Sequence, residues 1–170
     1  NGDLLPITDT SGDNDFGFFL PMVHLNYAVS PFTNIRFAWT NTYARPNYFD
    51  LAPYQLINRE DQELEIGNPG LDPTTAMNFD LMGEYYFSSV GVISAGVFYK
   101  DINNFIYNRQ FEFQSTGNLN GFDAVQPVNG EDAFLLGFEF NLQQPLTFLL
   151  GALDGFGIYV TYTYTDSEPD

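Results

Sequence analysis

The side chains best suited to catalysis are few in this sequence and lie far apart. His24 is the single histidine, and cysteine is absent. A Ser-His-Asp arrangement would have to join His24 to a serine such as Ser94, but the chain has no G-x-S-x-G turn, and Ser94 lies within a strand pattern. Asp80 and Glu84 lie on one side of a predicted strand, where two carboxylates either act as an acid–base pair or line a polar surface. The polar lining explains them better, and we predict that the chain is not an enzyme.

Metal and cofactor motifs are equally weak. Asp9, Ser11 and Asp13 match the first positions of a calcium loop. Asn14 stands where that loop needs glycine, however, and Leu20 stands where it needs glutamate. Neither a P-loop nor a dinucleotide-binding fingerprint occurs. We therefore predict a solvated acidic loop in this part of the chain, and no cofactor.

The composition favours a β-rich protein that does not bind nucleic acid. The 170 residues include 18 phenylalanines and 11 tyrosines. Acidic residues outnumber basic ones by 22 to 5, a net charge of −17, whereas nucleic-acid binding needs clustered lysine and arginine. No apolar run reaches the roughly 18 residues of a transmembrane helix. No signal peptide opens the chain, which starts at Asn1, so we expect a piece of a longer protein.

Six stretches of the chain alternate between apolar and polar residues with the two-residue period of a β-strand. Shorter connections at 30–34, 88–91 and 143–155 join them in pairs, so we predict hairpins at 20–44, 75–113 and 131–166. The second strand of the middle hairpin is predicted to continue to about Phe113. The apolar sides of the six runs consist of Val23, Leu25, Tyr27 and Val29; Ile35, Phe37 and Trp39; Phe79, Leu81, Tyr85 and Phe87; Ile93, Ala95, Val97 and Tyr99; Phe134, Leu136, Phe138, Phe140 and Leu142; and Ile158, Val160, Tyr162 and Tyr164.

Long segments without this period alternate with the hairpins, at 1–18, 45–74 and 114–130, and we predict them to be outer loops. Short and long connections that alternate are typical of an up-and-down barrel in an outer membrane, with short turns on the periplasmic side. About ten alternating residues in a strand suit a tilted crossing of the hydrocarbon layer. The predicted fold is all-β, an antiparallel up-and-down meander of about six strands that forms a segment of a transmembrane β-barrel.

Charged residues within the alternating runs avoid the apolar side. Arg36, Asp80, Glu84 and Glu139 all lie on the opposite side, as a lipid-facing surface requires, because a charge at mid-bilayer costs roughly 2–4 kcal/mol. Lys100 shares that polar side, and we predict that it pairs with Asp80 or Glu84 on the neighbouring strand. A half-buried sheet in a soluble protein also keeps charge off its core side, so this pattern alone fits both lipid and core.

Two further features favour lipid. Of the 22 acids, 16 lie in 1–18, 45–74, 114–132 and 166–170, on the long-loop side of the sheet. Aromatic residues near the strand ends suit an interfacial girdle; they are Tyr43, Tyr85, Phe87, Tyr99, Tyr159, Tyr162 and Tyr164. The polar side then lines a lumen, and His24 is predicted to be a lumenal or interface histidine.

Several segments, in order and at matching spacing, resemble the C-terminal barrel of the TonB-dependent outer-membrane receptor family of Gram-negative bacteria. They are Tyr43–Pro46, Phe49–Leu51, Gly67–Pro73, Asn78–Leu81, Glu84–Phe87, Gly96–Ile102, Phe105–Ile106, Leu149–Gly157 and Tyr162–Ser167. Members of this family are plugged barrels of twenty-two strands that import siderophore complexes, cobalamin or glycans with energy relayed by TonB. The resemblance covers about Leu20 to the end. It implies a truncated part of the barrel wall in the outer membrane, without plug or TonB box, whose partners are lipid, a small-molecule or oligosaccharide ligand, and the TonB complex through the parent protein's plug.

Ligand contacts are expected from the outer loops and the upper lumen, because aromatic rings offer stacking and arginine offers bidentate anion binding. The candidates are Tyr48, Tyr54, Arg59, Tyr107, Arg109 and Phe111. The alternative is that these side chains pack one loop on another. Two rival functions also stay open: a passive porin-like barrel, and a soluble acidic β-sandwich that acts as an adhesin or glycan-binding module. The sandwich would gather Phe37, Leu81, Val97, Phe138 and Val160 into a sealed interior.

Overall fold

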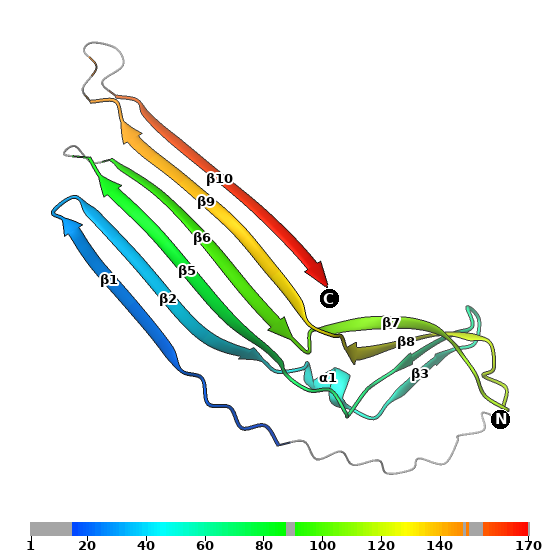
Figure 1. The fold of residues 1–170 in the computed structure, drawn as a ribbon. Coiled ribbons are helices and arrows are strands. Elements are labelled where there is room, and N and C mark those ends of the chain that lie inside the picture. The colour runs from blue at the N-terminus through cyan, green and yellow to red at the C-terminus, as the bar shows by residue number, and fades with distance from the viewer. Residues whose placement is uncertain (1–14, 88–90, 148, 150–154, 170) are drawn as a thin grey trace. The chain divides into compact units, whose positions relative to one another are not determined.

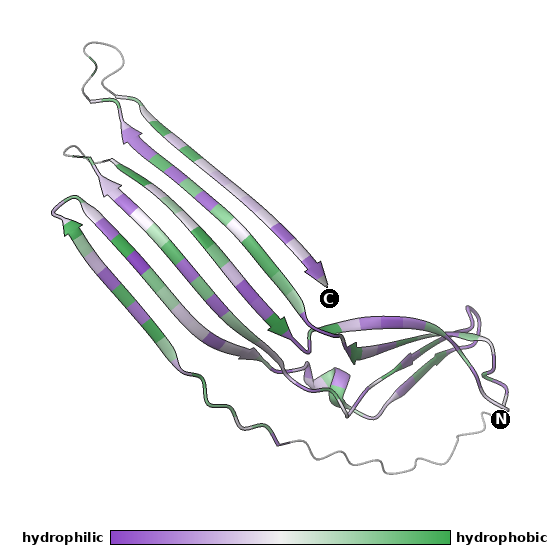
Figure 2. Ribbon diagram, viewed as in Figure 1, coloured by the Kyte–Doolittle hydropathy of each residue, from purple (hydrophilic) through white to green (hydrophobic). Residues whose placement is uncertain are grey.

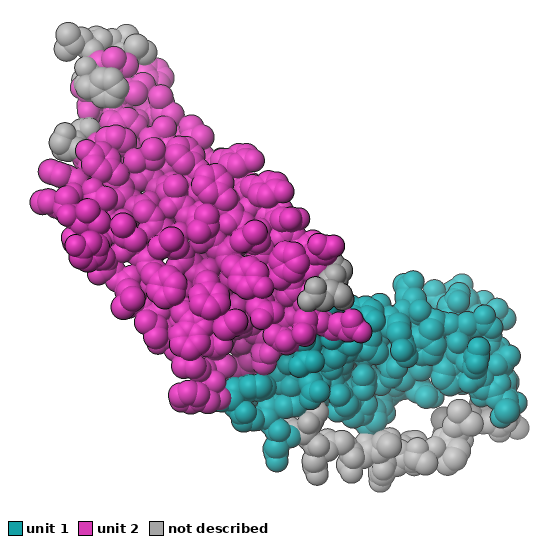
Figure 3. Space-filling view, in the orientation of Figure 1, with its two compact units in different colours: residues 1–18, 44–74, 104–130 teal, residues 19–43, 75–103, 131–170 magenta. Residues whose placement is uncertain are grey.

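The computed structural model describes residues 15–87, 91–147, 149 and 155–169. The chain divides into two compact units, coloured separately in Figure 3. The four-stranded unit comprises residues 1–18, 44–74 and 104–130, and the six-stranded unit comprises residues 19–43, 75–103 and 131–170. The predicted calcium-like match at Asp9–Asp13 and most of the predicted loop at 1–18 lie outside the described residues.

The six-stranded unit holds one antiparallel sheet in which strands that follow each other along the meander are neighbours (Figure 1). Its strands appear in the order β1-β2-β5-β6-β9-β10. The predicted all-β meander of six strands is thereby confirmed. The strand bounds are β1 Met22–Ser30, β2 Thr33–Ala44, β5 Thr74–Tyr86, β6 Val92–Asn103, β9 Ala133–Pro145 and β10 Gly157–Pro169.

The strand register places the apolar residues of the six strands on one face. Leu81 lies opposite Val97, and Val97 lies opposite Phe138. Phe138 in turn lies opposite Tyr164 on β10. Residues directly opposite each other in a sheet point to the same side, so the alternation along each strand becomes a continuous apolar face across the sheet. Figure 2 shows this alternation along the strands.

No described residue of the six-stranded unit covers this apolar face. Leu81 is 48% exposed, Val97 49%, Phe138 37% and Val160 43%, and Phe37 is half-buried. The sealed interior of a β-sandwich is therefore not formed by these five residues. Among the described residues, no helix has both the length and the apolar character needed to cross a membrane.

The connections of the sheet differ in detail from the predicted turns. The first turn is tight, because Ser30 Oγ accepts a hydrogen bond from the Phe32 backbone nitrogen at 3.1 Å and donates to Thr33 Oγ1 at 3.0 Å. The second is closed by the Phe87 backbone nitrogen, which donates to the Gly91 carbonyl oxygen at 2.9 Å. Residues 88–90 of that turn, and 148 and 150–154 of the last one, lie outside the described residues.

The four-stranded unit contains a helical turn and short strands within 45–74 and 114–130, segments for which the sequence showed no strand period. That these segments are outer loops of a barrel stays a prediction. The sheet order is β3-β4-β8-β7, with β4 and β8 parallel. Its short strands show too few residues for a period to be recognised, and their pairing joins distant parts of the chain. The elements are α1 Tyr48–Leu51, β3 Gln55–Asn58, β4 Glu63–Ile66, β7 Ile106–Phe113 and β8 Phe122–Asn129.

The predicted strand that reached Phe113 is in fact two strands in two sheets. β6 ends at Asn103, and Asn104 has a positive φ of 56°, a left-handed conformation that asparagine adopts more readily than most residues. β7 then begins at Ile106 and pairs with β8. The bend at Asn104 thus transfers the chain from one unit to the other.

A small hydrophobic core stabilises the four-stranded unit. One buried cluster consists of Leu64, Leu119, Phe122 and Ala124. Leu71, which belongs to the same unit, is also fully buried. Partly buried residues that pack against the cluster are Ile57, Ile66, Phe111 and Phe113. Among the described residues, all the buried large hydrophobic side chains belong to this unit.

Candidate functional site

All six predicted ligand-contacting residues lie in the four-stranded unit, in three separate places. Tyr48 begins α1 and is 81% exposed. Asn47 caps this single turn, because its Oδ1 accepts a hydrogen bond from the Phe49 backbone nitrogen at 3.1 Å. The cap holds the Tyr48 side chain on the surface, where it is available for contact.

Tyr54 is held more firmly than Tyr48. Its ring packs against Phe49, with 4.3 Å between ring centroids, and its hydroxyl donates to Glu65 Oε1 at 2.8 Å. Partial burial raises the pKa of Tyr54 to about 12, with help from the hydrogen bond to Glu65 and the negative charges of Glu65 and Asp50. Gly67 leaves room for this ring, because a Cβ there would lie 2.9 Å from two Tyr54 ring carbons. Tyr54 is therefore a fixed, neutral side chain.

Three predicted residues come together on β7. Tyr107, Arg109 and Phe111 occupy alternate positions and so share one face of the strand. The Arg109 guanidinium carbon lies 4.8 Å from the Phe111 ring centroid, a cation–π contact, and the rings of Phe105 and Tyr107 are 5.8 Å apart. Phe111 also packs against the buried cluster, whereas Tyr107 is 44% exposed. The result is an aromatic and cationic row anchored at its Phe111 end.

Arg59 stands apart in the turn between β3 and β4 and is exposed. Asn58 organises this turn: its Nδ2 donates to Asp61 Oδ2 at 2.7 Å, and its Oδ1 accepts from the Glu60 backbone nitrogen at 3.2 Å. Gln62 completes the turn with a positive φ of 58°. Arg59 thus lies beside acidic neighbours rather than beside the row on β7.

The polar face of the four-stranded sheet holds a groove that the sequence reasoning missed. The volume of this groove is about 560 Å³. A hollow on the six-stranded sheet is smaller, at about 420 Å³. The groove depends on the parallel pairing of β4 with β8, which no local sequence pattern predicts. The available signal was the polar character of the even-numbered positions on β7. The polar residues that line the groove are Glu63, Glu65, Asn108, Gln110 and Asp123.

The predicted lumenal charges lie on the polar face of the six-stranded sheet. Arg36 Nη2 and Glu84 Oε2 form an ion pair at 3.1 Å, and the Tyr86 hydroxyl donates to the same Glu84 oxygen at 2.9 Å. The predicted pairing of Lys100 with Asp80 or Glu84 was wrong. Lys100 lies opposite Asn78, and within the described part of the chain it forms no ion pair.

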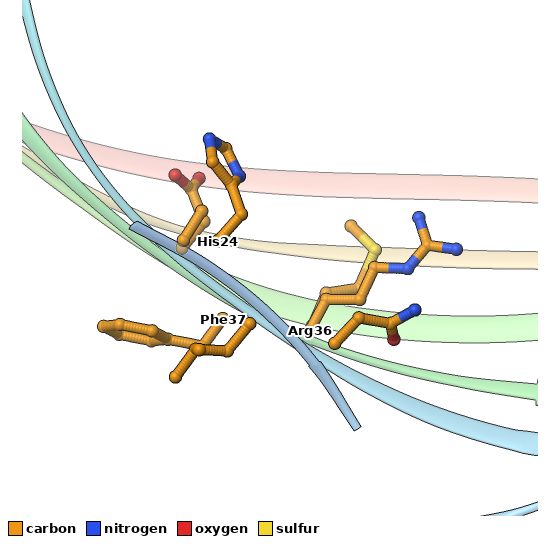
Figure 4. Close-up of a pocket in the computed structure, with 8 residues that line it drawn as sticks. His24, Arg36 and Phe37 are labelled. Carbon is orange, nitrogen blue, oxygen red and sulfur yellow. The ribbon is translucent and has the colours of Figure 1, made fainter. Parts of the chain in front are cut away.

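His24 and Arg36 point to the same side of the sheet, and Phe37 points to the other (Figure 4). The hollow on the polar side is also lined by Asp80 and Met82. A neighbouring hollow of about 300 Å³ brings together Asp80, Lys100 and Glu139. The face therefore carries the five predicted lumenal charges, which are Arg36, Asp80, Glu84, Lys100 and Glu139.

The chemistry available in both units is recognition by hydrogen bonds, charge and aromatic contact. Over the described residues, no group of three or more histidine, cysteine, aspartate or glutamate side chains is arranged to hold a metal ion. The strongest local features are the row on β7, the Tyr54–Glu65 hydrogen bond and the Arg36–Glu84 ion pair.

Comparison with protein-family models gives a match over residues 1–170 to the family described as TonB dependent receptor-like, beta-barrel. A search of curated protein sequences gives no match.

Among solved structures, the siderophore receptor PirA from Pseudomonas aeruginosa is 22% identical, with a TM-score of 0.73 over 89% of this chain and 28% of that chain. A variant of the ferric enterobactin receptor PfeA from the same species, in complex with enterobactin, is 24% identical, with a TM-score of 0.60 over 75% of this chain and 20% of that chain. The siderophore receptor PirA from Acinetobacter baumannii is 20% identical, with a TM-score of 0.55 over 73% of this chain and 20% of that chain. These likenesses show the fold, and the chain spans less than a third of each structure.

Proposed function

Because the chain belongs to the TonB-dependent receptor β-barrel family, we propose that it forms part of the wall of an outer-membrane receptor that takes up a siderophore-type ligand. Energy for uptake would reach the parent protein from the TonB complex through its plug domain. The proposal assigns three roles to this chain: a lipid-facing surface, a lumenal surface and a ligand-contacting unit.

The observation that carries the proposal is the exposed apolar face of the six-stranded sheet. Its large side chains, including Leu81, Val97 and Leu136, are each close to half exposed. A contiguous apolar surface across six strands is far more than a water-soluble monomer normally leaves uncovered. Strands of 9 to 13 residues are long enough to cross a bilayer with tilt. Lipid tails are the solvent that suits this face.

The opposite face supports a water-filled or plug-filled lumen. Arg36, Glu84 and Tyr86 satisfy one another there by an ion pair and a hydrogen bond. The Arg36 side chain still exposes 52% of its surface. Charged groups at mid-strand are tolerated when they line a barrel interior, so the two faces of one sheet fit the two environments of a barrel wall.

Ligand contact is assigned to the four-stranded unit. Tyr107 and Arg109 on β7 offer an exposed ring and an exposed guanidinium on a strand that is anchored at Phe111. The similar solved structures are siderophore receptors by name, one of them in complex with enterobactin, which favours a siderophore-type small molecule.

Two matched lysine substitutions in the full-length receptor test the lipid-facing role. Leu81 and Met82 are neighbours near the middle of β5 but point to opposite faces. Leu81→Lys places a charge among lipid tails and is expected to destabilise the inserted barrel by about 2–4 kcal/mol. Met82→Lys places the same charge in the lumen and is expected to change stability by less than about 1 kcal/mol.

The measurement is reversible unfolding in lipid vesicles, with the yield of heat-modifiable barrel in outer membranes as a second readout. Equal destabilisation by the two substitutions would contradict the assignment of the faces. Uptake of radiolabelled ferric siderophores, compared between cells with and without a functional TonB system, tests the transport role separately.

A further inference from the structure

Three of the five places where the chain passes between the two units lie close to one side chain, the carboxamide of Asn129. Its Oδ1 accepts a hydrogen bond from the Asp72 backbone nitrogen at 2.9 Å. Its Nδ2 donates to the Asp72 carbonyl oxygen at 2.9 Å and to the Asn104 carbonyl oxygen at 2.9 Å. Asn129 thus ties the segment before β5, the segment after β6 and the end of β8 together, and all of these residues belong to the same unit.

The backbone around Asn129 is shaped to make these bonds. The left-handed conformation of Asn104 turns its carbonyl oxygen so that it accepts both from Asn129 and from Thr74 Oγ1, the latter at 3.0 Å. The Gly130 backbone nitrogen donates to the Phe105 carbonyl oxygen at 2.7 Å. A Cβ at Gly130 would lie within 2.5–2.9 Å of the Phe105 ring, so glycine is needed for this close approach.

These contacts fix the start of β7, where the proposed ligand surface begins. Ile106, the first residue of β7, lies opposite Asn129, and Tyr107 lies opposite Val128. The Phe105 ring, held against Gly130, is in contact with the Tyr107 ring at 5.8 Å between centroids. The orientation of Tyr107 therefore depends on the segment that Asn129 secures.

We infer that Asn129 is a positioning residue for ligand binding, which fixes the Phe105–Tyr107 ring pair in one orientation without touching the ligand. This inference rests on the proposed function, because it assigns the ligand to the β7 surface. Holding a binding surface in its bound conformation raises affinity by reducing the entropy lost on binding. Asn129 is half-buried and ends β8, so it supports this surface from behind.

Other contacts keep the segment 67–74 in place when Asn129 is replaced, so a substitution there should act locally. Asn68 Nδ2 donates to the Pro127 carbonyl oxygen at 3.0 Å, and Gln126 Nε2 donates to the Gly67 carbonyl oxygen at 3.3 Å. Leu71 is fully buried in the same segment. The four-stranded unit is thus expected to stay folded in the variants described next.

Two substitutions in the full-length receptor separate the three hydrogen bonds of Asn129. Asn129→Ala removes all of them, whereas Asn129→Asp keeps the acceptor for the Asp72 nitrogen and loses both donors. We expect hydrogen exchange at the Asp72 amide to accelerate about tenfold in the alanine variant only. We expect exchange at the Gly130 amide to accelerate about tenfold in both, and at the Leu64 amide in neither. Asn118, an exposed carboxamide in the same unit, supplies matched control variants to alanine and aspartate.

Ligand affinity is measured on the same proteins with ferric complexes of a catecholate, a hydroxamate and a carboxylate siderophore. For a complex that binds the wild type, both Asn129 variants are expected to bind about five- to thirtyfold more weakly, mainly through faster dissociation, and the Asn118 variants are expected to be unchanged. Unchanged exchange at the Gly130 amide in Asn129→Ala would show that the Asn129 hydrogen bonds do not hold this segment in place, whether or not the wild type binds a ligand. Equal affinity of wild type and variants would overturn the positioning role alone. A wild type that binds none of the complexes would contradict the proposed function and the positioning role together, while leaving the exchange result intact.

Discussion

Leu64 in the four-stranded unit is 1% exposed, and Leu81 in the six-stranded unit is 48% exposed, although both are leucines within β-strands. The difference extends to the units as wholes. The four-stranded unit has a compact cluster around Leu64, Phe122 and Ala124. The six-stranded unit has strands of up to 13 residues and leaves the apolar side chains of one face open.

This contrast shows that apolar residues stabilise the two units against different surroundings. In the four-stranded unit, burial of apolar area against other side chains supplies the hydrophobic stabilisation expected of a water-soluble fold. In the six-stranded unit, the same residue types make few contacts within the sheet, so their stabilising partner has to come from outside. Lipid supplies that partner in the proposed barrel, where backbone pairing between strands satisfies the polar groups.

The largest effect is expected from truncating the core of the four-stranded unit. Leu64→Ala should destabilise this unit by about 2–5 kcal/mol, because the cavity left by a fully buried leucine cannot be filled by solvent or lipid. The matched substitution Leu81→Ala should cost less, about 1–2 kcal/mol, since lipid tails can fill the space beside this open face and only the transfer free energy of the lost side-chain atoms is forfeited. Local unfolding free energies from hydrogen exchange at β4 and β5 amides check both values. A larger loss at Leu81 than at Leu64 would reverse the comparison.

A second substitution tests where the six-stranded unit is closely packed. Gly137 on β9 lies directly opposite Phe98 on β6, and a side chain at Gly137 would collide with the Phe98 ring on the polar face. Gly137→Val is therefore expected to destabilise the barrel by about 1–3 kcal/mol. Gly83→Ala is the control, because the nearest atom to an added Cβ there is the Ala95 carbonyl oxygen at 4.0 Å. Unfolding in lipid vesicles measures both, and an equal loss for the two glycines would contradict close packing at Gly137.

The six long strands were predictable from the sequence because each keeps a two-residue period for most of its length. That period arises because alternate side chains of a strand meet different surroundings, which is a local property of the sequence. The strands β3 and β4 have four residues each, too few for such a period to be recognised. Nor is the parallel pairing of β4 with β8 visible in a local pattern, since it joins residues about sixty positions apart. The break at Asn104 was missed for a related reason. Most apolar and aromatic residues of β7 fall at odd-numbered positions, as the residues on the apolar side of β6 do, so the alternation in the sequence continues past Asn104 without a break.

The candidate site was predictable in residue type and less so in arrangement. The alternation of side chains within each strand is enough to place Arg36, Glu84 and Lys100 on the same side of the sheet. Which of the two cations meets Glu84 depends on the stagger of neighbouring strands, and here Arg36 does. The three-way contact of Asn129 with Asp72 and Asn104 likewise depends on how distant segments meet, so no spacing in the sequence pointed to it.

The smallest expected effect concerns pH and is confined to the four-stranded unit. The pKa of Tyr54 is raised from 10.0 to about 12, chiefly by partial burial and by its hydrogen bond to Glu65. A phenol whose pKa is higher in the folded than in the unfolded chain stabilises the fold fully below pH 10, and this contribution is lost as the pH rises from 10 to about 12. Tyr54→Phe should therefore lower the stability of the unit by about 1 kcal/mol at neutral pH and weaken its alkaline dependence. Hydrogen exchange at neutral pH and tyrosinate absorbance against pH measure the two effects. Because Tyr54 lies outside the six-stranded unit, alkaline titration of Tyr54 should leave exchange in β5 and β6 unchanged, and a coupled loss there would show that the two units do not respond independently.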